Sequence, residues 1–178
     1  MAGQDERART ARDGHDEVDE LARLFREHPA WRAAAHRVDD ASTSDVYFSS
    51  RPGKAWHLAR REGETLLCTG RSADPDFVFR FTPGAVERLA DVEGGPGSFA
   101  VELFRLMTES DPSVRVDFRI AAPFARLLRR GYLTLLASGG FRVLAFGASR
   151  GVHTLADLRA LVARIYSSHP EPWECRSD

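Results

Sequence analysis

The sequence predicts an α+β fold, in which an antiparallel and mostly meandering β-sheet of about five to six strands is covered by helices on one face. Three observations predict it. Short segments rich in aromatic and branched residues follow one another from residue 45 and are separated by the turn sequences RPG and EG. Apolar residues recur at helical spacing before and after these segments. The strands also do not alternate with helices, as a doubly wound parallel sheet would require.

Two helices are expected ahead of the sheet. Apolar residues recur at helical spacing over residues 18–25, and Pro29 after His28 closes this helix. A second apolar stripe covers residues 31–38. Three strands are then expected in DVYFSS, KAWHLARRE and ETLLCTGR, at residues 45–50, 54–62 and 64–71.

The segment DFVFRF predicts a strand with one aromatic face. Phe77, Phe79 and Phe81 alternate along it and therefore lie on one face, while Arg80 points to the other. The sequence TPGAVERLA follows directly and predicts a helix that Thr82 can cap. One face of this strand is expected to be buried.

A further helix and strand are expected after the glycine-rich stretch EGGPG. Ser98 is expected to cap the helix FAVELFRLMTE. In SVRVDFRI, the apolar residues Val114, Val116, Phe118 and Ile120 alternate with charged ones. This alternation predicts a strand with an apolar face and a solvated one.

The last part of the domain is harder to assign. Pro123 can start a helix that carries Phe124, Leu127 and Leu128 and that Gly131 ends or bends. The apolar run at 132–136 fits either a buried helical turn or a strand. The segment 131–146 could serve as a lid, a core element or an interface. FRVLAFGA, residues 141–148, predicts a last strand, and Thr154 and Asp157 form a capping pair at the start of a final amphipathic helix, residues 154–166.

The chain of 178 residues is long enough for one domain with a substantial core. We expect a disordered arm at residues 1–14, a single domain at 15–168 and a tail at 169–178. The charged N-terminus lacks the apolar run of a signal peptide, and no stretch reaches the about 18 apolar residues of a membrane span. A soluble, cytoplasmic protein is therefore expected, and its two isolated cysteines, Cys68 and Cys175, predict no zinc or redox motif.

The charge balance argues against a nucleic-acid partner. Lys54 is the only lysine among 25 basic residues, and arginine suits phosphate recognition. However, 26 acidic residues bring the formal net charge to -1, so no strong polyanion partner is expected. The six histidines are scattered without metal-ligand spacing, so we predict no metal and no cofactor.

The sequence GASRG, residues 147–151, fits the pattern that places a nucleophilic serine at a strained turn in one class of hydrolases. Asp157 and His169 follow Ser149 and could complete a triad. That mechanism, however, needs a mostly parallel sheet and further strands to hold the acid and the histidine. Since the sequence predicts neither, we do not assign a catalytic role to Ser149.

Other candidates for acid-base chemistry are isolated residues. His57, in AWHLA, lies in the middle of a predicted strand beside Trp56. A lone strand histidine is more often structural than catalytic. The sequence DPD at residues 74–76 could supply paired carboxylates, but before a strand it is better interpreted as a turn.

One stretch resembles a known family. The order of elements in AWHLARREGETLLCTGRSADPDFVFRFTPGAVERLA, continued by ELFRLMTESDPSVRVDFRI, is similar to that of the sterol carrier protein type 2 family, over roughly residues 45–130. The resemblance implies an α+β fold that encloses an apolar tunnel for a sterol, a fatty acid or an acyl-CoA.

The leading hypothesis is therefore a non-enzymatic carrier of an apolar small molecule or lipid. Its expected ligand-binding residues are Phe77, Phe79, Phe81, Phe99, Leu103, Leu106, Met107, Val116 and Phe118. From sequence, a core filled by these side chains looks the same as a ligand pocket. The alternatives are an enzyme that uses the same pocket with His57 or Tyr132 as acid or base, and an accessory module that binds another protein through its sheet face or through helix 154–166. The sequence leaves the oligomeric state open.

Overall fold

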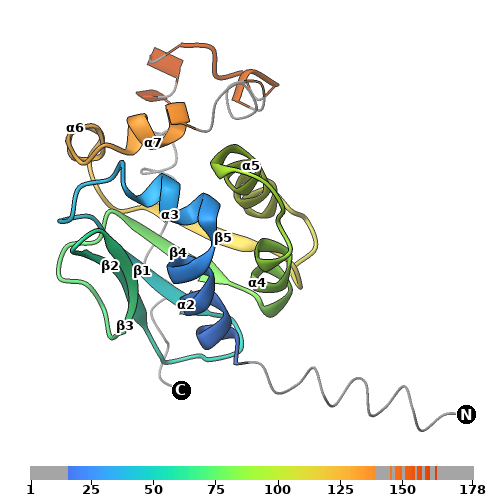
Figure 1. Cartoon of the computed structure of the whole chain (residues 1–178). Coiled ribbons are helices and arrows are strands. Elements are labelled where there is room, and N and C mark those ends of the chain that lie inside the picture. The colour runs from blue at the N-terminus through green and yellow to red at the C-terminus, as the bar shows by residue number, and fades with distance from the viewer. Residues whose placement is uncertain are drawn as a thin grey trace, which may run out of the picture.

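The computed structural model describes residues 16–138 and, beyond them, residues 145, 147–149, 151–154, 156–157, 159–160 and 163. The described residues form one five-stranded β-sheet with helices packed against it, an α+β arrangement as predicted (Figure 1). The predicted arm at 1–14 and tail at 169–178 lie outside the described residues. Within the described part of the chain, no helix combines the length and hydropathy needed to cross a bilayer.

The first strand of the chain lies at the centre of the sheet. The strands are β1 (Thr43–Phe48), β2 (Trp56–Arg61), β3 (Glu64–Thr69), β4 (Phe77–Phe81) and β5 (Val116–Ile120). Their order across the sheet is β3-β2-β1-β4-β5. The three strands β1, β2 and β3 form the predicted antiparallel meander.

The sheet is mixed, so the expectation of an antiparallel sheet was wrong for one pair of strands. β1 and β4 are parallel, with Ser44 opposite Phe77 and Phe48 opposite Phe81. After β3, the chain crosses the face of the sheet away from the helices, where the Asp45 carboxylate accepts a hydrogen bond of 2.7 Å from the Ser72 amide. Alternation of side chains has the same period in both kinds of pairing, so the sequence pattern does not encode the direction.

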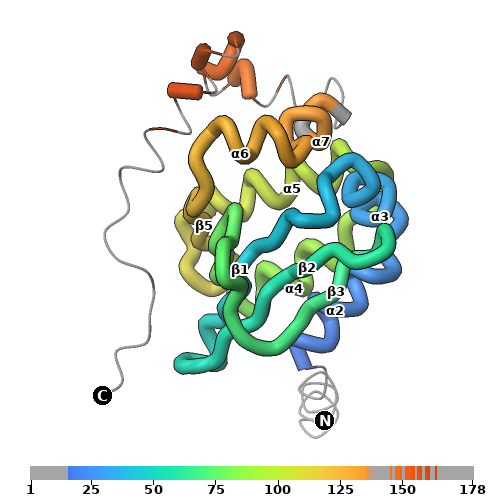
Figure 2. Tube along the Cα trace, turned by 90° about the vertical axis from the view of Figure 1, so that its left-hand side faces the viewer, coloured from blue at the N-terminus to red at the C-terminus, as the bar shows by residue number. Residues whose placement is uncertain are grey.

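Six helices are described in the range 16–138. They are α2 (Glu17–Glu27), α3 (Pro29–Ala35), α4 (Pro83–Ala90), α5 (Pro96–Met107), α6 (Phe124–Arg129) and α7 (Tyr132–Ser138). Helices α2 to α5 cover one face of the sheet, and α6 and α7 lie at one end of this layer (Figure 2). The apolar run left undecided between helix and strand is thus a helix, α7.

One helix start and one capping hydrogen bond differ from prediction. Helix α5 begins at Pro96 with Gly95 as its N-cap, ahead of the predicted cap Ser98. Thr82 does occupy the N-cap of α4, but its side chain makes no capping hydrogen bond. Its hydroxyl instead donates to the Arg115 carbonyl at 3.1 Å, which ties the end of β4 to β5.

The predicted strand at 141–148 lies mostly outside the described residues, and those described within it, 145 and 147–148, are helical. The predicted capping pair is confirmed. The Asp157 carboxylate accepts from the Thr154 amide at 2.8 Å, and the Thr154 hydroxyl accepts from the Asp157 amide at 3.1 Å. The helix that follows, predicted at 154–166, is described only in part, so its role as a protein-binding face stays a prediction.

The main core lies between the helices and the inner face of the sheet. Its fully buried side chains come from α2, β1, β4, α4, α5 and β5 and include Leu21, Val46, Phe81, Leu89 and Leu106. A second, smaller cluster around Ile120, Ala122 and Leu127 lies where β5 runs into α6. An unfilled region is lined by residues of both clusters.

Candidate ligand cavity between the sheet and the helices

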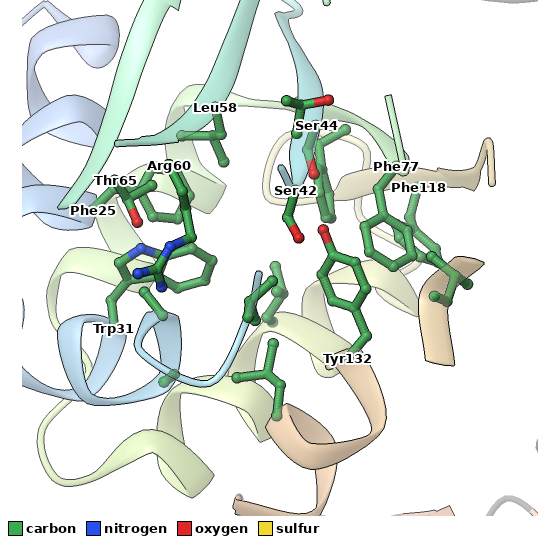
Figure 3. A pocket seen from close by; sticks show the side chains of 18 of the residues that line it. Phe25, Trp31, Ser42, Ser44, Leu58, Arg60, Thr65, Phe77, Phe118 and Tyr132 are labelled. Atoms are coloured by element: carbon green, nitrogen blue, oxygen red, sulfur yellow. The ribbon is translucent and has the colours of Figure 1, made fainter. Parts of the chain in front are cut away.

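An apolar cavity of about 270 Å³ lies between the inner face of the sheet and helices α3, α5 and α7 (Figure 3). Its walls are almost entirely carbon. Side chains of β4 and β5 form one wall, side chains of α5 and α3 form the opposite one, and Tyr132 of α7 closes one side.

The sheet wall is a layer of aromatic rings. Phe79 of β4 lies opposite Phe118 of β5, and their ring centroids are 5.3 Å apart. The ring centroids of Phe77 and Phe118 are 5.4 Å apart, and those of Phe77 and Tyr132 are 4.7 Å apart, with the Tyr132 ring edge-on to Phe77. These spacings are typical of favourable aromatic contacts. Each ring is therefore held by contacts with its neighbours, and together the rings form one continuous wall of the cavity.

The helical wall combines large and small residues. Phe99, Leu103 and Met107 lie four positions apart along α5, so they form one stripe on its surface, and all three line the cavity. Ala34 and Ala35 of α3 line it as well, and both are buried. Alanine at these two positions leaves room that a leucine would occupy.

Seven of the nine residues expected to bind ligand line the cavity, and two do not. The seven are Phe77, Phe79, Phe81, Phe99, Leu103, Met107 and Phe118. Leu106 and Val116 are instead buried in the core, at 0% and 1% exposure. Leu106 is offset from the α5 stripe that faces the cavity, and Val116 is at the end of β5 farthest from α6.

A buried carboxylate holds the α6–α7 region against the sheet. Asp76 is fully buried just before β4, and its carboxylate accepts from Arg130 at 2.6 Å and from the Tyr132 hydroxyl at 3.0 Å. The Arg126 Nε lies 3.2 Å from the same carboxylate, and Arg126 also binds the carboxylate of the exposed Asp74. The two carboxylates of DPD are therefore held by arginines, and Arg126 contacts both of them.

Tyr132 is not suited to act as a base. Burial, and next to it the negative charge of Asp76, raise the pKa of the Tyr132 phenol above its ordinary value of 10.0. A phenol with a raised pKa keeps its proton at neutral pH. Tyr132 thus lines the cavity as a hydrogen-bond donor to Asp76, and its role there is to position α7.

His57 and Ser149, the other residues considered for catalysis, are not part of the cavity wall described here. The side chain of His57 points to the opposite face of the sheet, where Nδ1 lies 2.9 Å from the Gly70 carbonyl. Since a carbonyl only accepts, Nδ1 carries the proton. Ser149 is helical, and so are the described residues just before it, 145 and 147–148. Within the described residues, no group of three metal-ligating side chains is found.

Sequence analysis missed one polar part of the wall. Arg60, Thr65 and Trp31 line the cavity at the end nearest the β2–β3 hairpin. The position of Arg60 could in part have been predicted, because Trp56, Leu58 and Arg60 alternate along β2 and therefore lie on the same face of the sheet. An arginine in a strand is nevertheless expected to be solvated, so its inward position was not predicted.

Comparison with known proteins adds one structural likeness. No family model and no curated protein matches the chain. Among solved structures, the chain is similar to one titled UbiJ-SCP2 Ubiquinone synthesis protein, with a TM-score of 0.41 and 14% sequence identity, over 70% of this chain and 88% of that chain. A TM-score of this size carries no inference about ligand or activity.

Proposed function

We propose that the protein binds an apolar small molecule, or the apolar part of a lipid, in the cavity between the sheet and the helices, and carries it without chemical change. The observation that supports this most is the cavity itself. Its volume is about 270 Å³ and its lining is apolar. A hydrocarbon chain that moves from water into such a space gains about 0.8 kcal/mol for each buried CH₂ group.

The volume favours some ligands over others. Pockets for drug-sized ligands span roughly 300–1,000 Å³, so a cavity of about 270 Å³ is near the lower end. A single hydrocarbon chain fits such a space better than a fused ring system does. Among the ligands that the sequence resemblance implies, a fatty acid or the acyl part of an acyl-CoA is therefore favoured over a sterol.

A variant that fills the cavity tests the proposal. Leu103→Trp adds an indole to the α5 stripe that faces the cavity, and we expect it to lower the affinity for a fluorescent long-chain fatty acid at least tenfold. Arg105→Trp adds the same group two positions further along the helix, on an exposed side chain, and should bind like the wild type. Equal binding by the Leu103→Trp variant and the wild type would count against the proposal.

A further inference from the structure

We propose that Arg60, together with Thr65 and Trp31, forms an anchor for the carboxylate of the ligand at the hairpin end of the cavity. This inference rests on the proposed function and narrows it, because it assigns a chemical class to the ligand: a long-chain molecule that ends in a single carboxylate. A neutral sterol offers only a hydroxyl to such an anchor and no negative charge to pair with the guanidinium.

The Arg60 guanidinium is the main observation. Its side chain is 8% exposed and lines the cavity. Its Nε donates to the carboxylate of Asp40 at 3.2 Å, but that partner is 64% exposed. The Nη1 of Arg60 is buried and has no hydrogen-bond partner among the described residues. A buried charged donor left unpaired is costly, and arginine cannot escape the cost by losing its proton.

Two further donors lie beside it. Thr65 is directly opposite Arg60 in the β2–β3 pairing, so both side chains are on the inner face. The Thr65 hydroxyl and the Trp31 indole Nε1 are buried and, within the described part of the chain, also lack partners. Figure 3 shows the three side chains, from β2, β3 and α3, gathered at the same end of the cavity. All three can donate, so the missing partner is an acceptor.

A second hollow gives this end a polar approach. It has a volume of about 180 Å³ and shares Phe25, Ala35 and Thr65 with the apolar cavity. Its remaining lining is mainly charged or polar and comprises Arg26, Arg32, His36, Glu62, Gly63 and Glu64. A chain lying in the apolar cavity with its head group at Arg60 would thus have its polar end on the side of this hollow.

The charge of the anchor favours a carboxylate over a phosphate. One guanidinium faces the cavity, and Asp40 already offsets part of its charge. A carboxylate carries a single negative charge and has two oxygens that accept several hydrogen bonds. Arg60, Thr65 and Trp31 together supply enough donors for it. A phosphate dianion would need further cations, and the cavity wall described here includes no other charged side chain.

The test compares a fatty acid with its uncharged ester. Affinities for palmitic acid and methyl palmitate are measured by calorimetry with the wild type, Arg60→Met and Arg61→Met. We expect the wild type to prefer the acid by about 10- to 100-fold, as for a hydrogen-bonded charge. The Arg60→Met variant should lose this preference, because the substitution weakens the binding of the acid and not that of the ester. Arg61 is exposed and lies on the opposite face of β2, so Arg61→Met should keep the preference.

Thr65→Val serves as a second, milder variant. We expect it to lower the affinity for the acid about fivefold and to leave the affinity for the ester unchanged. The anchor is wrong if the wild type binds acid and ester equally, or if both Arg60→Met and Thr65→Val keep the full preference. Binding of neither compound by the wild type would overturn the proposed function together with the anchor. A third outcome would overturn the anchor alone. In it, the wild type binds acid and ester equally well, and the Leu103→Trp variant binds neither.

Discussion

Asp76 shows how one buried side chain positions a wall of the cavity. Its carboxylate binds Arg130 and Tyr132, which flank the junction of α6 and α7, while its backbone carbonyl accepts from the amides of Ala121 and Ala122 after β5. The same residue therefore connects the start of β4, the end of β5 and the helix whose tyrosine lines the cavity. Removal of its charge would leave two arginines in the region without a buried partner.

Substitution of Asp76 should be far more costly than substitution of its neighbour. Loss of one member of a buried ion pair costs about 3–5 kcal/mol, so we expect Asp76→Ala to lower the free energy of unfolding by this amount. Asp74→Ala is the matched control, because the Asp74 side chain is 65% exposed, and exposed pairs contribute about 0–1 kcal/mol. Urea unfolding of both variants measures the difference, and similar losses would contradict a central role for Asp76.

The individual residues also show what could be predicted from sequence. The aromatic face of β4 followed from strict alternation, and Phe77, Phe79 and Phe81 do line the cavity. Asp76 and Arg60 were not recognised as buried, because aspartate and arginine are normally exposed. The partners of Asp76 are more than fifty residues away along the chain. No local pattern connects them, so only the fold reveals their contacts.

At the scale of elements, the junction between α6 and α7 depends on a glycine. Gly131 has a φ of +84°, and a Cβ at this position would lie 2.4 Å from the Arg37 carbonyl oxygen. The neighbouring Arg130 carbonyl accepts from the Asp39 amide at 3.0 Å. The junction thus packs against the backbone that follows α3, and α7 is held over the cavity by this close approach.

Two glycine variants separate this close approach from backbone strain. Gly131→Ala places an alanine in the left-handed region and also brings its Cβ against the backbone of Arg37. Gly53 has a similar φ of +83°, but no atom lies within 4 Å of an added Cβ, so Gly53→Ala introduces the strain without the clash. Strain alone costs about 1–2 kcal/mol. We expect Gly131→Ala to lose at least about 2 kcal/mol more than Gly53→Ala in chemical denaturation. Equal losses would mean that the junction moves away from Arg37 at little cost.

The kinds of elements were easier to predict than their pairing. Nearly all predicted helices and strands in the range 16–130 exist, since apolar periodicity reports directly which face is buried. The parallel contact between β1 and β4 was missed, because it depends on where the loop after β3 crosses the sheet. Residues 132–136 were ambiguous for a related reason: a run that is apolar on all sides has no period to read.

At the scale of the whole molecule, the cavity is lined by residues of all five strands and of all six helices described in the range 16–138, so its filling should stabilise all of them together. A ligand present at 100 times its Kd adds about 2.7 kcal/mol. For a domain of this size, we expect the Tm to rise by about 5–10 °C. Differential scanning calorimetry with and without palmitic acid measures the rise.

The Leu103→Trp variant is the control for this thermal shift. Its cavity is already occupied by the added indole, so palmitic acid should leave its Tm unchanged within about 1 °C. A rise of the same size in this variant would place the fatty acid elsewhere on the protein.

The parallel pair at the centre of the sheet also has a consequence for how the chain folds during its synthesis. The meander of β1, β2 and β3 can form as soon as it leaves the ribosome, but the partner of Ser44 in β4 lies about 30 residues further along. Until β4 arrives, β1 is an unpaired edge whose inner face carries Val46 and Phe48. Such an edge can pair with other chains. A pause in translation after the meander has left the ribosome but before β4 has done so would therefore favour aggregation of the nascent protein more than a later pause.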